Sequence, residues 1–230
     1  MKRWVPLFSN LPHSLPQVWL RGSLSNGQTF GWKCTVEDSG DEIWVGVLEK
    51  QVIRLKQKPF QPNDEIIPPV YYCSMQPENR GELSVLDQVN IERINKFFRT
   101  DIDLDAYLET WSSLCPRFAK LSKRFRGIRL LDQEPVECLF SFLCSQNNNI
   151  TRISSMLQAL RDEFGEEIEG EQLKSFPTVE NLFSKGNEDI YKKLGKHEHQ
   201  RELLEVYLTR IEQHNQQLYG RLQVNSQALA

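Results

Sequence analysis

The sequence predicts an α+β fold in which an N-terminal antiparallel β domain is followed by helices. Short runs rich in β-branched and aromatic residues, separated by turn residues, occupy positions 16–75. After Gly81, apolar residues recur at helical spacing instead. Strands first and helices afterwards are typical of the α+β class. We therefore expect a β domain over 1–82, a helical domain over 83–195 and a separate tail over 196–230.

The chain is long enough to form an ordinary hydrophobic core. It has 230 residues, of which 39% are hydrophobic and 10% aromatic. A chain of this mass buries roughly 70% of its unfolded surface. The aromatic content excludes a disordered or collagen-like chain. No apolar run reaches the length of about 18 residues that a membrane-spanning helix needs, so we expect no membrane partner.

The predicted strands lie close together in the first third of the chain. Ile43–Leu48 and Val52–Leu55 are joined by three polar residues, which predicts a hairpin. Asn26-Gly27 is a strong turn signal. Val70–Met75 follows two prolines and is predicted as an edge strand, because proline cannot donate to a sheet.

Helices are predicted from residue 84 onward. Ser84 is a candidate N-cap for a helix that runs to Thr100, with Leu86, Ile94 and Phe97 on one face. Further helices are expected over 103–113, 116–126, 134–145, 149–164 and 187–194. In the tail, Leu203, Tyr207 and Ile211 repeat at i, i+4 and i+8, which favours a surface helix.

The cysteines and histidines do not predict a metal or cofactor site. The five cysteines have irregular spacing and no Cys-x-x-Cys pair, which is typical of buried, reduced thiols in an intracellular protein. His197 and His199 flank Glu198, which is not the spacing of the helical His-Glu-x-x-His motif. We expect neither a metal nor another cofactor.

Positive charge is concentrated in one stretch of a chain whose net charge is −3. Residues 117–130 contain no acid and six cations: Arg117, Lys120, Lys123, Arg124, Arg126 and Arg129. Two interpretations remain open. The stretch can be the solvated face of an amphipathic helix, or it can contact the phosphates of a nucleic acid.

The most informative segment is 134–164. Its first helix is apolar on nearly all sides, so we expect it to be buried, with Pro135 in its first turn. The apolar residues are Leu139, Phe140, Phe142, Leu143 and Cys144. The second helix has a predicted buried face composed of Ile150, Ile153, Leu157, Leu160 and Phe164.

Three consecutive asparagines, 147–149, separate these helices, and Asn149 is a candidate N-cap of the second. Arg152 lies in the first turn of that helix, where a cation opposes the helix dipole. An anion held at the helix N-terminus would reverse this cost. The asparagines are therefore either caps and a turn, or polar groups that are presented with Arg152 to a nucleic-acid strand.

Several motifs resemble those of eukaryotic 8-oxoguanine DNA glycosylases, which belong to the helix-hairpin-helix glycosylase superfamily. The resemblance covers about residues 10–195. It rests on four segments in the family's order: Asn26-Gly27-Gln28-Thr29-Phe30-Gly31-Trp32, Trp44-Val45-Gly46-Val47-Leu48, Phe125-Arg126-Gly127-Ile128-Arg129-Leu130-Leu131 and Glu137-Cys138-Leu139-Phe140-Ser141-Phe142-Leu143-Cys144-Ser145-Gln146-Asn147-Asn148-Asn149-Ile150.

The resemblance implies a base-excision repair enzyme that removes oxidised guanine opposite cytosine from double-stranded DNA and then cleaves the strand. Such enzymes flip the damaged base out of the helix. By motif match, Asn147 would fill the vacated space, Arg152 would contact the orphaned cytosine, and Gly27 would offer its carbonyl to the base. Asn149, Lys123, Arg126 and Arg129 are further predicted DNA contacts.

The family's catalytic motif is not present in these 230 residues. The family uses a lysine after Leu-Pro-Gly-Val-Gly and an aspartate after Pro-Val, whereas here Pro-Val precedes only Tyr71 and Glu137. From Lys196 onward the resemblance ends. We therefore predict no catalytic residue and no turnover by this chain alone. The alternatives are a non-catalytic isoform that binds DNA weakly, a product without function, or an incorrect gene model. We expect a monomer in the nucleus or mitochondria.

Overall fold

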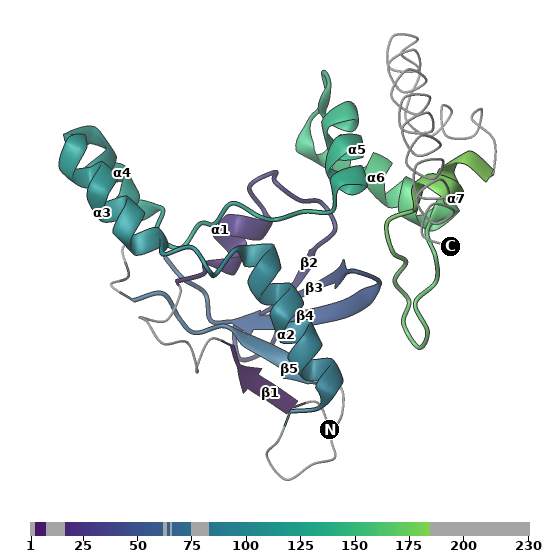
Figure 1. Cartoon of the computed structure of the whole chain (residues 1–230), viewed down its shortest axis with the longest axis horizontal. Helices are drawn as coiled ribbons and strands as arrows, with labels where there is room; N and C mark the ends of the chain where they lie inside the picture. Colours follow the sequence, from purple (N-terminus) through teal and green to yellow (C-terminus); the bar gives the residue numbers. More distant parts are fainter. Residues whose placement is uncertain (1–2, 8–16, 62–63, 65, 75–82, 185–230) are drawn as a thin grey trace, which may run out of the picture.

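The computed structural model describes residues 3–7, 17–61, 64, 66–74 and 83–184. In Figure 1, a small antiparallel sheet lies beside a long helix, and further helices extend to both ends of the molecule. The predicted α+β class is confirmed. The helix expected over 187–194 and the tail over 196–230 lie outside the described residues. Within the described part, no helix has the length and apolar character to cross a membrane.

The sheet has five antiparallel strands in the order β1-β5-β4-β3-β2. The strands are β1 (Arg3–Pro6), β2 (Lys33–Val36), β3 (Glu42–Leu48), β4 (Gln51–Gln57) and β5 (Tyr71–Ser74). The β3–β4 hairpin is the one that the sequence predicts. Strands β1 and β2 were not individually predicted, because each has only four residues and neither shows a clear alternation.

The hairpin turn is tighter than expected. Leu48 pairs with Gln51, so only two residues form the loop, Glu49 and Lys50. Both have positive φ, at 46° and 63°, which the right-handed twist of a two-residue hairpin favours. Ion pairs hold the turn in place: Glu49 contacts Arg93 at 2.7 Å, and Lys50 contacts Glu166 at 2.6 Å.

The prediction that the strand near residue 70 lies at an edge is wrong. Strand β5 pairs with β4 on one side and with β1 on the other. Pro68 and Pro69 precede its first residue, Tyr71, so they remove no hydrogen bond from the strand itself. The N-terminal strand β1 supplies the outer neighbour that the sequence alone did not reveal.

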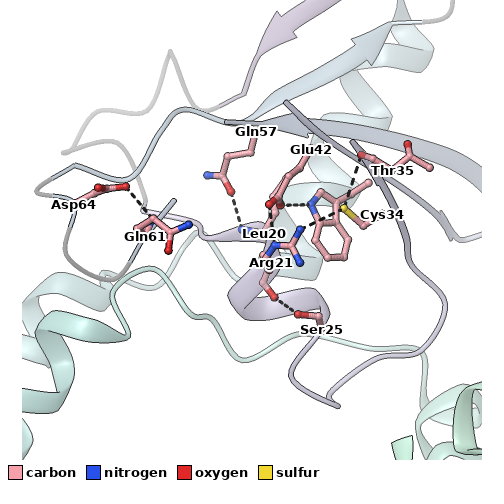
Figure 2. A network of polar contacts seen from close by, with 10 residues as sticks. Leu20, Arg21, Ser25, Cys34, Thr35, Glu42, Gln57, Gln61 and Asp64 are labelled. Atoms are coloured by element: carbon pink, nitrogen blue, oxygen red, sulfur yellow. Dashed lines mark hydrogen bonds and ion pairs between the residues drawn. The ribbon is translucent and has the colours of Figure 1, made fainter. Parts of the chain in front are cut away.

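A short helix, α1 (Leu20–Leu24), connects the sheet to the Asn26-Gly27 turn. Two buried side chains of the sheet hold it, as Figure 2 shows. The backbone N–H of Leu20 donates to Gln57 Oε1 at 2.9 Å. The guanidinium of Arg21 donates to Glu42 Oε1 at 2.8 Å, while the indole of Trp44 donates to Glu42 Oε2 at 3.1 Å. The two carboxylate oxygens of Glu42 thus join α1 to β3.

The long helix α2 (Val85–Phe98) closes the first core over the sheet. Ser84 caps it as predicted, in a reciprocal capping box with Asp87. Ile94 and Phe97 are buried against the sheet, but Leu86 is 41% exposed, contrary to expectation. The core combines strand and helix residues: Leu7, Val18, Leu20, Leu24, Trp44, Ile53, Leu55, Val70, Tyr72, Ile94, Phe97, Phe98 and Leu131. The change from strands to helices near residue 82 therefore does not divide this core, since α2 belongs to it.

The remaining helices form two groups in Figure 1. The hairpin of α3 (Leu104–Leu114) and α4 (Pro116–Arg124) projects at one end of the long axis, and α5 (Pro135–Ser145), α6 (Ile150–Phe164) and α7 (Val179–Ser184) lie toward the other. A second core joins α5, α6 and α7, with Phe140, Leu157, Leu160 and Leu182 fully buried. The predicted positions of α3, α4, α5 and α6 are confirmed to within about two residues.

None of the five cysteines forms a disulfide, and they are not uniformly buried. Cys73 and Cys144 are buried, and burial raises the pKa of Cys144 to about 12. Cys115 is exposed, because its side chain caps α4 at the tip of the helical hairpin. The prediction of buried thiols thus fails at Cys115.

Candidate nucleic-acid interface

The three asparagines between α5 and α6 have three different roles. Asn147 has a positive φ of 53° and turns the chain, and its side chain is exposed. Asn148 donates from Nδ2 to the carbonyls of Cys144 and Gln146, at 2.8 and 3.1 Å, and so satisfies the end of α5. Asn149 is the N-cap of α6, as predicted. Its Oδ1 accepts from the backbone N–H of Arg152 at 2.9 Å.

Asn147, three residues before the first residue of α6, and Arg152, in the first turn of that helix, are therefore both exposed. The capping bond uses only the oxygen of the Asn149 amide, and that residue is exposed too. The first turn of a helix presents unpaired N–H groups and a positive dipole end. Amide groups and a guanidinium at this position can hold a phosphate or the edge of a base.

The helices beneath this junction are less enclosed than the sequence predicts. Phe140 and Cys144 of α5 are buried, but Phe142 is 69% exposed, so the helix is not covered on all sides. On α6, Ile153, Leu157, Leu160 and Phe164 form the predicted buried face, whereas Ile150 is 58% exposed. The two exceptions lie in the last turn of α5 and at the first residue of α6, on either side of the asparagines in sequence.

The Asn26-Gly27 turn is held rigidly at an exposed position. Gly27 has a φ of 92°, and no heavy atom lies within 4 Å of where a Cβ would be, so the space beside it is open. Asn26 Oδ1 accepts from the N–H of Gln28 at 3.0 Å. The amide of Gln28 then bonds to the backbone of Arg129 and Leu131, at 2.9 and 3.1 Å. Gln28 therefore fixes the turn to the segment that leads into α5.

A largely buried ion pair joins α5 to α6 and lies close to Gly31. Glu137 of α5 accepts a hydrogen bond from Arg161 of α6, and Arg161 also lies 5.3 Å from the ring of Phe176. A Cβ on Gly31 would come within 2.8 Å of the Arg161 guanidinium, so a larger residue there would require the guanidinium to shift. Burial raises the pKa of Glu137, and the charge of Arg161 opposes that rise. The ion pair therefore helps to set the position of α5 relative to α6.

Sequence reasoning missed this pair, although a signal was present. Arg161 lies at i+4 from Leu157 and i−3 from Phe164, so it falls on the buried face of its own helix. Glu137 is likewise the one carboxylate within the apolar helix α5. Two opposite charges on facing apolar surfaces predict a partner for each, because an unpaired buried charge is costly.

The predicted cations do not form one continuous patch. Lys123 is exposed on α4, and Arg126 is half-buried just after it. Figure 1 places α4 at a distance from the α5–α6 junction, so the cations of α4 and the asparagines are separate surfaces. In the part of the chain that is described, no group of three or more His, Cys, Asp or Glu side chains could hold a metal ion.

The prediction that Arg129 contacts DNA is wrong. The residue is 4% exposed, and its guanidinium donates to three backbone carbonyls. The acceptors are Gln17 at 2.9 Å, Arg99 at 2.8 Å and Ile102 at 3.1 Å. Burial lowers the pKa of Arg129, and the nearby carboxylates of Asp105, Asp101 and Asp103 oppose this. Arg129 joins the end of α2 to the loop before α1 and is a structural residue.

Two solved structures that contain DNA share this fold. The 8-oxoguanine glycosylase/lyase of Clostridium acetobutylicum, in complex with DNA that contains cytosine opposite 8-oxoG, superimposes with a TM-score of 0.65 at 22% identity, over 94% of this chain and 66% of that one. A complex of MBOgg1 with a low-affinity DNA ligand gives a TM-score of 0.64 at 23% identity, over 86% of this chain and 61% of that one. At these identities the likeness establishes the fold, which is that of the 8-oxoguanine glycosylase/lyases.

Sequence comparisons give the family. The model for the N-terminal domain of 8-oxoguanine DNA glycosylase matches residues 10–139. The N-glycosylase/DNA lyase OGG1 of Arabidopsis thaliana is 34% identical over 196 residues, 84% of this chain and 47% of its own length. An N-glycosylase/DNA lyase of Saccharomyces cerevisiae is 44% identical over 104 residues, 44% of this chain and 27% of its own length. The chain belongs to the 8-oxoguanine DNA glycosylase family, and it spans about half or less of the curated relatives that it matches.

Proposed function

We propose that this chain recognises double-stranded DNA containing 8-oxoguanine opposite cytosine, as part of base-excision repair. The observation that carries the proposal is that two elements carrying the predicted contact residues are both exposed. Asn147 and Arg152 lie at the α6 N-terminus, and the Gly27 turn is tied through Gln28 to the segment that leads into α5. Both are held by hydrogen bonds within the chain: Asn149 caps α6, and Gln28 bonds to the backbone of Arg129 and Leu131.

Each element has a distinct task in this proposal. Asn147 enters the space that the flipped base leaves, and Arg152 donates to the orphaned cytosine. Gly27 offers its carbonyl to the N7–H that 8-oxoguanine has and guanine lacks, a difference of about 1–3 kcal/mol if the carbonyl is left unpaired with guanine. Asn149, Lys123 and Arg126 contribute polar and phosphate contacts.

We further propose that the 230 residues of this chain bind DNA without cleaving it. Family members are N-glycosylase/DNA lyases, but the lysine motif that forms the covalent intermediate does not occur in this sequence. A lysine that remains solvated keeps a pKa near 10.4, so less than about 0.1% is the neutral nucleophile at pH 7. We place the protein at nuclear DNA as a monomer, with mitochondria as the second compartment.

Two measurements on the purified chain test the proposal. Binding to a fluorescent duplex with 8-oxoguanine opposite cytosine should weaken with salt at a log–log slope of about −0.9 per phosphate contact. Arg152→Gln should reduce the affinity for the damaged duplex more than for single-stranded DNA. The matched control is Lys33→Gln, which removes an exposed cation on strand β2. It should change neither the affinity for the damaged duplex nor the affinity for single-stranded DNA.

Borohydride trapping separates binding from catalysis. The chain should form no covalent adduct with the damaged duplex, whereas a full-length family enzyme should form one in the same assay. An adduct with this chain would overturn the proposal that it does not cleave DNA. Binding that does not depend on salt would overturn the proposal that its cations contact DNA phosphates.

A further inference from the structure

The α3–α4 hairpin has an apolar face that nothing in the described structure covers. Neither helix contains a buried residue. Five large apolar side chains are exposed: Tyr107 at 52%, Trp111 at 45%, Leu114 at 77%, Leu121 at 43% and Phe125 at 53%. We call these five residues the hairpin face. So many exposed aromatic and aliphatic side chains on one small motif are unusual for a surface that faces only water.

The five residues lie on the same side of the hairpin. The rings of Tyr107 and Trp111 are 5.5 Å apart, and Trp111 meets Phe118 of α4 edge-on at 5.8 Å. Leu121 and Phe125 follow Phe118 at helical positions i+3 and i+7, on the side turned toward Trp111. The opposite flank is polar, where the hydroxyls of Ser112 and Ser122 lie 3.2 Å apart.

Caps and a proline define the ends of the two helices of the hairpin. Cys115 ends α3 and caps α4, and Pro116 begins α4 with its fixed φ. Asp103 caps the start of α3 by accepting from the N–H of Ala106 at 3.1 Å. At the base, Arg129 holds the carbonyls of Arg99 and Ile102. A preformed surface binds with less loss of conformational entropy.

The charge beside this face has one sign. Arg117, Leu121 and Arg124 are spaced at i, i+4 and i+7, so the two cations border the apolar stripe of α4. Neither arginine forms an ion pair with any residue that the structure describes, and 117–130 contains no acid. On α3, Asp105 and Glu109 are each rotated about 160° around the helix from Tyr107, and about 120° and 160° from Trp111.

We propose that the hairpin face docks an amphipathic helix of a protein partner, with acidic residues on the flank that meets α4. Two antiparallel helices present a groove into which a third helix packs with apolar residues at i, i+3, i+4 and i+7. The partner's carboxylates would pair with Arg117 and Arg124 at the rim. Duplex DNA satisfies the arginines but leaves the apolar side chains uncovered, so this surface is distinct from the proposed DNA interface.

Peptide binding to the full chain tests the proposal. The probe is a fluorescent peptide of about 18 residues, with leucine and phenylalanine on one helical face and glutamate beside it. One control has the same composition in scrambled order, and the other has lysine in place of glutamate. The acidic amphipathic peptide should bind saturably, and the scrambled peptide about tenfold more weakly.

Variants separate the apolar from the charged contribution. Leu121→Glu should lower the affinity for the acidic peptide about tenfold. The double variant Arg117→Glu/Arg124→Glu should bind the lysine peptide more tightly than the acidic peptide. Lys123, two residues before Phe125, lies about 160° around α4 from it. Lys123→Gln should therefore lower the affinity for DNA but leave the affinity for the acidic peptide unchanged.

Three results would overturn the docking proposal. The first is that the scrambled peptide binds as tightly as the acidic amphipathic peptide. The second is that binding does not saturate at millimolar peptide. The third is that the charge-reversed double variant still prefers the acidic peptide. Binding of the chain to vesicles of phosphatidylserine and phosphatidylcholine that Leu121→Glu abolishes, without peptide binding, would assign the face to a membrane surface instead. The double variant is expected to gain affinity for the lysine peptide. A general loss of folding would lower the affinity for both peptides, so it cannot imitate this result.

Discussion

Replacing Arg129 by methionine should destabilise the protein without removing a DNA contact. The side chain is 4% exposed and donates to the carbonyls of Gln17, Arg99 and Ile102. Methionine has a similar length but no donor, so three carbonyls lose a charge-assisted hydrogen bond. Each bond of this kind contributes about 1.5–3 kcal/mol, while removal of a buried charge recovers part of its desolvation cost. The expected net loss is about 2–4 kcal/mol.

Urea unfolding followed by circular dichroism measures this loss. With a slope of about 3 kcal/mol per molar urea, the midpoint should fall by roughly 1 M. Arg129→Lys keeps the charge but has one donor group in place of a planar fork, so it should give an intermediate value. Lys123→Met, at an exposed position on α4, is the matched control and should change stability by less than about 0.5 kcal/mol.

The DNA-contact interpretation of Arg129 makes the opposite prediction. It requires unchanged stability and a salt slope that is smaller by about 0.9 in Arg129→Met. That outcome would refute the structural role derived from the three carbonyls.

Substitutions at two further positions test individual contacts. Asn149→Ala should cost about 1 kcal/mol because α6 loses its cap, whereas Asn149→Asp should keep the cap and weaken only DNA binding, as urea unfolding and duplex titration will reveal. Burial raises the pKa of Tyr72 to about 12, so its neutral form contributes stability that is complete below about pH 10 and disappears as the pH rises to about 12. Unfolding at pH 9 and 11 should therefore show a stability difference between the native chain and Tyr72→Phe that shrinks at the higher pH, and a constant difference would contradict this.

Elements with strong local signals were predicted correctly. The β3–β4 runs, the Ser84 cap and the Asn149 cap depend on neighbouring residues, so the sequence contains their whole cause. The prediction was weaker for strands that are defined by pairing with a neighbouring strand. β1 and β2 are four-residue strands that become recognisable only when paired, and β5 moved from edge to interior because β1 pairs with it.

The site shows the same division. The sequence predicted Asn147, Arg152 and Gly27 as DNA or base contacts, and the structure finds all three exposed, while the contacts themselves stay a prediction. It could not separate Arg129 from Lys123, since both belong to the same run of cations. Only burial distinguishes them: one guanidinium faces three carbonyls inside the protein, and the other cation faces solvent.

The sequence by itself determined the family, the α+β order of elements and the caps that position the asparagine turn. These follow from short-range patterns, in which each residue acts on neighbours a few positions away. The tertiary structure decided which charges are structural, how Gln28 ties the Gly27 turn to residues 129 and 131, how the Glu137–Arg161 pair joins α5 to α6, and that no described residue covers the α3–α4 face. Those properties depend on contacts between residues far apart in the chain, and the free energy of a charged or apolar side chain is set by what surrounds it.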